Sequence, residues 1–74
     1  MTRLYDAYTN QEIKTFHTVA GFAVRQGDVL NIDGVQFKVK TIEHMFETRG
    51  HAIVYIERKI YVTQRNGHVL HWLL

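Results

Sequence analysis

The sequence predicts an all-β fold, a small antiparallel barrel or strongly twisted sheet of about five or six strands. Two dipeptides, Asp33-Gly34 and Asn66-Gly67, each separate two β-patterned runs. Asp-Gly and Asn-Gly favour type I′ hairpin turns, because both central residues of that turn require a positive φ. Proline is absent, so every residue after the first can donate a backbone hydrogen bond to a neighbouring strand.

The chain has 74 residues, which is enough for one domain spanning residues 1–74. A domain of this size buries only about 60% of the surface of its unfolded chain, so its stability often needs reinforcement. There is no cysteine, which excludes disulfides and thiol chemistry. Self-association is the common reinforcement that remains.

The composition is that of a globular protein, with 46% hydrophobic and 22% charged residues. No apolar run reaches the roughly 18 residues of a membrane span. The segment Met1–Asp6 lacks the apolar core of a secretion signal. We therefore expect a soluble, cytoplasmic protein that does not act at a membrane.

The first elements are a strand over residues 4–8 and a second element within residues 9–21. Thr9 and Glu12 have capping-box spacing and Gly21 could end a helix, so a short helix near residues 10–20 is one interpretation. Thr15, Thr18 and Val19 favour a strand instead. We expect the strand, entered through a turn at residues 9–11.

The central hairpin follows from the turn at Asp33-Gly34, which pairs Ile32 with Val35 and Leu30 with Phe37. Because side chains alternate along a strand, this register gives one apolar face and one exposed face. The first face holds Leu30, Ile32, Val35, Phe37 and Val39, and the second holds Val29, Asn31, Gln36, Lys38 and Lys40.

The strand should continue through residues 41–47, although its alternation breaks near Lys40-Thr41. A β-bulge there would return Ile42 to the apolar face and bend the sheet. The spacing of Ile42, Met45 and Phe46 also fits one helical turn. Residues 48–50 should form the next turn, and residues 52–56 are so apolar that we expect the central buried strand there.

Metal and catalytic sites are not predicted, and neither is a cofactor. His68 and His71 would point to opposite sides of a strand, and no acidic residue follows Glu57. Serine and cysteine are both absent. Glu43 and His44 are adjacent in a strand, so they too would face opposite sides. No glycine-rich phosphate-binding motif occurs. We expect a protein that is not an enzyme.

The C-terminal hairpin is the candidate binding surface. A two-residue turn at Asn66-Gly67 would place large apolar groups on both faces of residues 60–74, and a single core can bury only one of them. The pairs on one face are Arg65 with His68, Thr63 with Leu70, and Tyr61 with Trp72. The candidate binding residues are Lys59, Tyr61, Arg65, His68, Leu70 and Trp72.

Several interpretations of this surface remain open. Tyr, Trp and Arg are favoured anchors in protein interfaces, so the hairpin could bind a partner protein or form a homo-oligomer. Tyr61 and Trp72 could instead stack on nucleic-acid bases while the cations meet phosphates. An oligomeric sponge for a small nucleotide would need basic residues that converge between protomers. Alternatively, a strongly curved barrel covers both faces and Trp72 belongs to the core.

One stretch of the chain resembles a known group of proteins. The matching segments are Gly27-Asp28-Val29-Leu30, Ile32-Asp33-Gly34, Phe37-Lys38-Val39, Ile42-Glu43-His44 and residues 51–57. They resemble small β-barrel proteins encoded by phages and prophages, and they look SH3-like before OB-like. The resemblance covers residues 27–57. It implies a non-enzymatic binding or assembly module, a viral protein that acts in the host cytoplasm.

Overall fold

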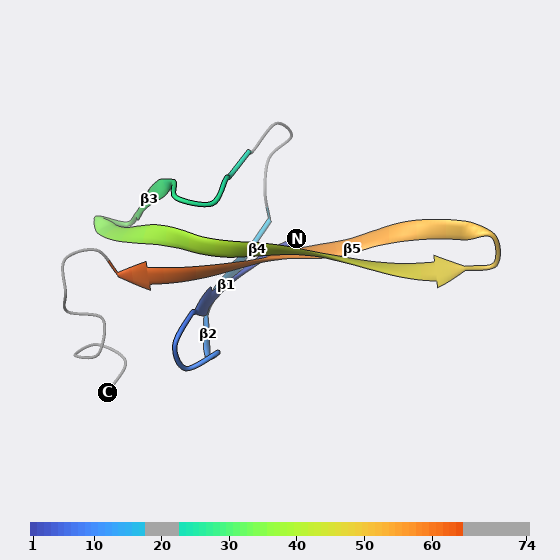
Figure 1. Ribbon diagram of the computed structural model, residues 1–74, viewed down its shortest axis with the longest axis horizontal. Helices are drawn as coiled ribbons and strands as arrows, with labels where there is room; N and C mark the ends of the chain where they lie inside the picture. The colour runs from blue at the N-terminus through green and yellow to red at the C-terminus, as the bar shows by residue number, and fades with distance from the viewer. Residues whose placement is uncertain (18–22, 65–74) are drawn as a thin grey trace.

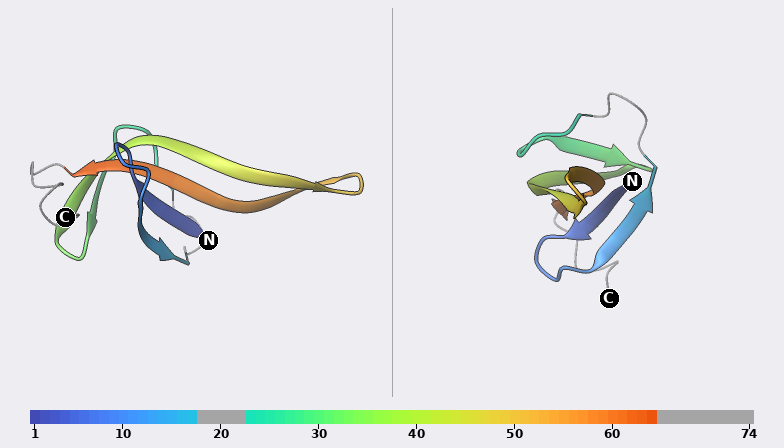
Figure 2. Two further views of the ribbon diagram at one scale, coloured as in Figure 1. Left: turned by 90° about the horizontal axis from the view of Figure 1, so that it is seen from below. Right: turned by 90° about the vertical axis from the view of Figure 1, so that its right-hand side faces the viewer.

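The computed structural model describes residues 1–17 and 23–64, which form one curled five-stranded sheet (Figures 1 and 2). The strands are β1 (Thr2–Asp6), β2 (Glu12–Phe16), β3 (Val29–Ile32), β4 (Val35–Arg49) and β5 (Ala52–Gln64). Their order in the sheet is β2-β1-β5-β4-β3. The predicted all-β fold is confirmed. The end-on view in Figure 2 shows the sheet curling into a half-barrel.

The β3–β4 hairpin has the predicted register, with Ile32 opposite Val35 and Leu30 opposite Phe37. Asp33 and Gly34 both have positive φ, 53° and 84°, as a type I′ turn requires. The side-chain oxygen of Asn31 accepts a hydrogen bond from the Gly34 N–H at 3.0 Å. Burial alternates along both strands as expected, so the hairpin has one apolar face and one exposed face.

Two β-bulges shape the β4–β5 hairpin, one at Lys40 in β4 and one at Ile56 in β5, where Met45 stands opposite Glu57 but Phe46 stands opposite Tyr55. The predicted bulge lies at Lys40, where the register shifts between Val39 and Thr41, and Ile42 returns to the apolar face against the core. The single-turn helix considered for residues 42–46 is wrong, because β4 continues to Arg49. The turn is formed by Gly50 and His51 and not by residues 48–50 as predicted, because the two strands stay paired up to Arg49 and Ala52.

The N-terminal strands β1 and β2 form a second hairpin, which confirms a strand rather than a helix over residues 12–16. Asp6 ends β1. Its Oδ1 accepts hydrogen bonds from the backbone N–H groups of Tyr8 at 2.7 Å and Thr9 at 2.9 Å. Asn10 takes a positive φ of 61°, which Asn tolerates better than most residues. The C-terminal part of the predicted element, residues 18–21, lies outside the described residues.

One strand pair of the described sheet departs from the antiparallel expectation. β1 runs parallel to β5, with Thr2 opposite Arg58 and Asp6 opposite Val62. The two strands are far apart in sequence, so no short turn forces them to run in opposite directions. Because β4 pairs with the other side of β5, residues 58–62 have a neighbouring strand on both sides.

The core lies where the strands overlap and not where the sequence is most apolar. Its buried hydrophobic residues are Leu4, Phe37, Val39, Ile60 and Val62. The prediction that residues 52–56 form the buried central strand is therefore wrong. This segment is mostly exposed because it lies beyond the point where β1 begins to pair with β5.

The expected C-terminal hairpin at Asn66-Gly67 lies outside the described residues, and so do its residues 65–74. Of its predicted first strand, residues 60–65, the described residues 60–64 form the end of β5. There Tyr61 pairs with Tyr5 of β1 and Thr41 of β4. Both edges of Tyr61 are thus occupied within the five-stranded sheet.

Candidate functional site

The feature of the fold that most resembles a binding site is the free end of the β4–β5 hairpin, residues 43–57, which we call the arm. It projects from the rest of the sheet as a two-stranded ribbon (Figure 1). On one side, β1 pairs with β5 only from Arg58 onward. On the other side, Val39 is the last residue of β4 to bond the segment before β3, through Gly27 and Asp28. Within the described residues, no third strand pairs with the arm.

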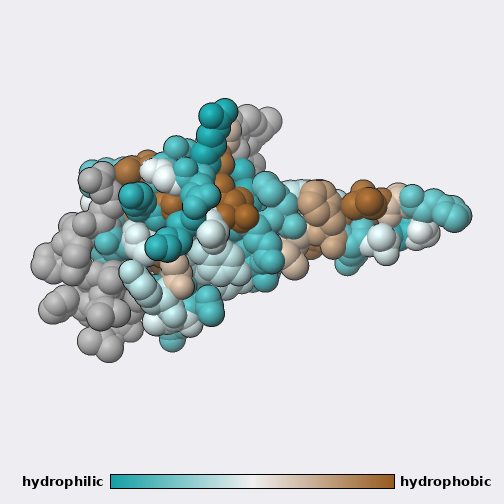
Figure 3. Space-filling view, in the orientation of Figure 1, coloured by the Kyte–Doolittle hydropathy of each residue, from teal (hydrophilic) through white to brown (hydrophobic). Residues whose placement is uncertain are grey.

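Large apolar side chains are exposed on the arm. Phe46 is 56% exposed, Ile53 73%, Tyr55 46% and Ile56 40%. Figure 3 shows hydrophobic residues continuing along the projecting ribbon, away from the body of the molecule. In the register of the hairpin, Phe46 stands opposite Tyr55 and Thr48 opposite Ile53. Phe46, Ile53 and Tyr55 therefore share one face of the arm, and this face continues the core face of the sheet.

An aromatic cluster stiffens this face. The rings of Phe46 and Tyr55 meet edge to face, with centroids 5.2 Å apart, and the His44 ring lies 5.9 Å from that of Tyr55. Nδ1 of His44 is 3.3 Å from the Tyr55 hydroxyl, within hydrogen-bond distance. Edge-to-face contacts are a preferred geometry for aromatic pairs. The cluster holds these rings in defined positions while leaving much of their surface open to solvent.

The base of the arm is tied to the N-terminal hairpin by an ion-pair network. Nε of Arg3 donates to Glu57 at 2.6 Å and its Nη1 donates to Glu12 at 3.0 Å. The hydrogen bond to Glu57, followed by that to Glu12, raises the pKa of Arg3. The pKa of Glu12 is lowered, first by the hydrogen bond from the Thr15 hydroxyl and then by that from Arg3. These contacts join β1, β2 and β5 where the arm leaves the sheet.

Two of the six predicted binding residues, Lys59 and Tyr61, lie in the described structure, near the base of the arm. The Tyr61 ring stacks on Tyr5 with centroids 5.4 Å apart, and Nζ of Lys59 lies 5.6 Å from the Tyr5 ring centre. The Tyr61 hydroxyl is 3.5 Å from a carboxylate oxygen of Glu43. The other four, Arg65, His68, Leu70 and Trp72, lie outside the described residues.

Sequence reasoning did not assign a contact role to Phe46, Ile53 or Tyr55. It placed residues 52–56 in the core because a run of apolar residues usually marks a buried strand. One signal was present in the sequence. The two β-patterned segments on either side of Gly50 are much longer than the other β-patterned segments of the chain. The shorter segments cannot pair along their whole length, so part of this hairpin had to extend beyond the sheet.

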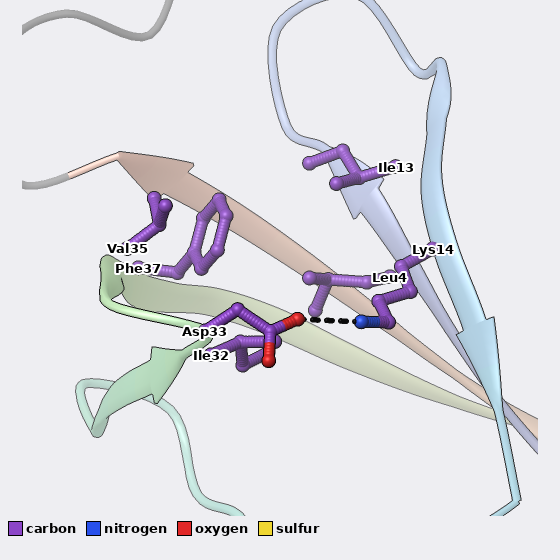
Figure 4. Close-up of a pocket in the computed structure, with 7 residues that line it drawn as sticks. All are labelled: Leu4, Ile13, Lys14, Ile32, Asp33, Val35 and Phe37. Carbon is purple, nitrogen blue, oxygen red and sulfur yellow. Dashed lines mark hydrogen bonds and ion pairs between the residues drawn. The ribbon is translucent and has the colours of Figure 1, made fainter.

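A shallow apolar cleft lies between the two edge strands β2 and β3, where the half-barrel does not close (Figure 4). Nζ of Lys14 donates to Asp33 across it at 2.8 Å, and this hydrogen bond lowers the pKa of Asp33. The volume at this point is about 190 Å³, and an adjoining part beside Phe16 and Leu30 has about 400 Å³. Among the described residues, Lys14 is the only cation that lines either part, and it is already paired.

A polar hollow of about 470 Å³ lies on the opposite, exposed side of β4. Lys38, Lys40 and the exposed ring of Tyr8 line it, together with Gln26, Gly27, Val39 and Thr63. Neither lysine forms an ion pair with another residue in the described part of the chain. This hollow therefore combines two available cations with an aromatic ring.

Comparison of the chain with protein families, curated proteins and solved structures finds no match. Residues 1–17 and 23–64 contain no group of three or more side chains suited to holding a metal ion. No helix long and apolar enough to cross a membrane occurs within the same residues.

Proposed function

We propose that this chain is a non-enzymatic binding and assembly module, which uses the β4–β5 arm to contact a second protein chain. The observation that carries the proposal is the exposed apolar face of the arm, formed by Phe46, Ile53 and Tyr55. Apolar patches of this kind on small proteins commonly mark sites of protein contact. The phage or prophage origin suggested by residues 27–57 fits this role, because such barrels act as adaptors and assembly pieces.

The energetics of a two-stranded ribbon support the same conclusion. An isolated hairpin is at best marginally stable in water, and stable sheets need at least a third strand or a packed face. The arm has neither within the described residues. A partner that covers Tyr55 and Phe46 would supply the missing packing, and aromatic residues are favoured anchors in such interfaces. A second copy of the chain is the simplest partner.

The proposal is tested by measuring mass in solution by light scattering across a wide range of protein concentration. We expect a wild-type mass above that of the monomer, and we expect Tyr55→Lys to lower it by placing a charge in the contact. Val29→Lys is the matched control, since Val29 is similarly exposed but lies on β3, away from the arm. A wild-type protein that stays monomeric at every concentration would overturn the assembly role.

Nucleic-acid binding is a second candidate, supported by the hollow beside Lys38, Lys40 and Tyr8. A base could stack on Tyr8 while the two lysines meet phosphates. Affinity for single-stranded DNA should then fall with rising salt, because binding releases the counterions that are condensed on the DNA and this release is less favourable at high salt. Lys38→Glu with Lys40→Glu should abolish binding, whereas Lys14→Met should not. Binding that does not depend on salt would exclude this function. The region around Tyr61 favours it less, since Glu43 places a carboxylate there.

A further inference from the structure

Within residues 1–17 and 23–64, no strand pairs with the outer edge of β5 in the arm, and its free backbone groups belong to defined residues. Gly50 has a positive φ of 63° and precedes His51 in a two-residue turn, as in a type II′ hairpin. The residues that flank such a turn, Arg49 and Ala52, form a hydrogen-bonded pair. Because the direction of backbone groups alternates along a strand, the N–H and C=O groups of Ile53 and Tyr55 point away from β4, toward the free edge.

The length of this free edge is limited at both ends. The turn at His51 closes one end. At the other end the Arg58 N–H donates to the carbonyl oxygen of Met1 at 3.1 Å, where β1 begins. Only residues 52–57 lie between these limits. A strand that pairs here must therefore be short, and it must end where β1 starts.

The residues of this edge are of the kind that proteins normally shield from solvent with another strand or a covering element. Residues 52–56 are all apolar and include three β-branched residues and a tyrosine. Natural proteins protect edge strands with charges, prolines or covering elements, since an unprotected apolar edge templates aggregation. Within residues 52–56 there is no charge and no proline. The flanking residues differ in chemistry, with His51 at one end and Glu57 at the other.

We propose that two copies of the chain pair through this edge, with β5 antiparallel to the partner's β5 and the two-fold axis at Val54. The inference rests on the proposed function and specifies its partner. In an antiparallel pair of strands, the residues whose backbone groups point toward the partner must stand opposite each other. Because these residues are Ile53 and Tyr55, the two-fold axis can pass only through Ile53, Val54 or Tyr55. An axis at Tyr55 would place the partner's Ala52 beside Arg58, whose N–H is already bonded to Met1. An axis at Ile53 would place Tyr55 opposite the partner's His51, which lies in the turn.

The axis at Val54 fills the available edge and matches the side chains. Ile53 then pairs with the partner's Tyr55 in both directions, and the β-bulge at Ile56 ends the paired stretch. Aromatic and β-branched residues make favourable cross-strand pairs. The two arms become one four-stranded sheet, closed by symmetry, which leaves no free β5 edge to recruit a third copy.

Cysteine cross-linking tests the register, because the natural chain contains no cysteine. Val54 would face its symmetry mate at a non-hydrogen-bonded site with Cα atoms about 4.5 Å apart, which suits a disulfide. Val54→Cys should therefore form a covalent dimer on mild oxidation. Glu47→Cys is the matched control, since Glu47 stands opposite Val54 in the hairpin. It would be three strand spacings from its mate, about 14 Å, and should not cross-link.

A second variant tests the backbone hydrogen bonds. Ile53→Pro removes an N–H that points away from β4, so the β4–β5 ladder should remain while the dimer is lost. Ile53→Val keeps that donor and should keep the dimer. If the wild type is dimeric but Val54→Cys cross-links no better than Glu47→Cys, or Ile53→Pro dimerises like Ile53→Val, this pairing is wrong while the proposed assembly role stands. A wild type that is monomeric overturns both.

Discussion

Ile53 and Ile60 form a natural pair for testing the fold, because both are isoleucines of β5 and both lie on the same face of the sheet. They differ in burial, since Ile60 is 0% exposed and Ile53 is 73% exposed. We predict that Ile60→Ala destabilises the protein strongly, and that Ile53→Ala has little effect on the isolated monomer.

The magnitudes follow from the area each side chain buries. Ile→Ala removes three carbon atoms, worth roughly 0.8 kcal/mol each when fully buried. For Ile60 the loss is about 2.4 kcal/mol, and the cavity left behind brings it into the range of about 2–5 kcal/mol. For Ile53 only about a quarter of the side chain is buried, so the same reasoning predicts about 0.6 kcal/mol. In a domain of this size the Ile60 change should lower Tm by about 10 °C or more.

The assay is urea unfolding followed by circular dichroism, at a protein concentration low enough for the chain to be monomeric. The m-value should stay constant, so that the shift in midpoint reports stability. At higher concentration the cost of Ile53→Ala should grow, because that residue then lies in a contact. A monomer that loses as much stability from Ile53→Ala as from Ile60→Ala would refute this assignment of the core and place residues 52–56 inside it.

Three further predictions test local contacts. Lys14→Met should raise the pKa of Asp33, measured by NMR titration. In the wild type, the stabilisation from the Lys14–Asp33 pair is present above the ordinary Asp pKa and is lost as pH falls through the lowered pKa of Asp33. If Lys14→Met leaves the pKa of Asp33 unchanged, the contact is disproved. Gly34→Ala should cost about 1–2 kcal/mol in urea unfolding through backbone strain alone, because an added Cβ meets no atom within 4 Å. Asp6→Ala should cost about 1–3 kcal/mol, since the N–H groups of Tyr8 and Thr9 lose their acceptor. Asp6→Asn keeps an acceptor and should cost less; equal losses would argue against the cap.

Local chemistry made the β3–β4 hairpin predictable. Asp33 and Gly34 tolerate the positive φ values of the turn, and a two-residue turn sets which residues face each other. The alternation of Leu30, Phe37 and Val39 then determined the buried face. Even the bulge at Lys40 was predictable, because one extra residue in a strand shifts the alternation of every residue after it.

The candidate site was less accessible to this reasoning. A run of apolar residues shows that a segment needs cover, but it does not show which chain supplies that cover. In the described part of the chain, residues 52–56 lack cover because β1 joins β5 only at Arg58, a parallel pairing between segments far apart in the sequence. Tyr61, predicted as a contact residue, stacks on Tyr5 of that same strand, a neighbour that the sequence pattern did not indicate.

The all-β class, the central hairpin and its two faces were predictable from the sequence, since turn chemistry and alternation act between neighbours in the chain. Which stretch of the long β4–β5 hairpin is buried depends on the packing of distant strands. Ile60 and Val62 lie in the core and Ile53 and Tyr55 lie outside it because the position at which β1 docks sets the limit of the covered sheet. The apolar pattern of a strand is the same on either side of that limit, so only the long-range pairing distinguishes core from exposed surface.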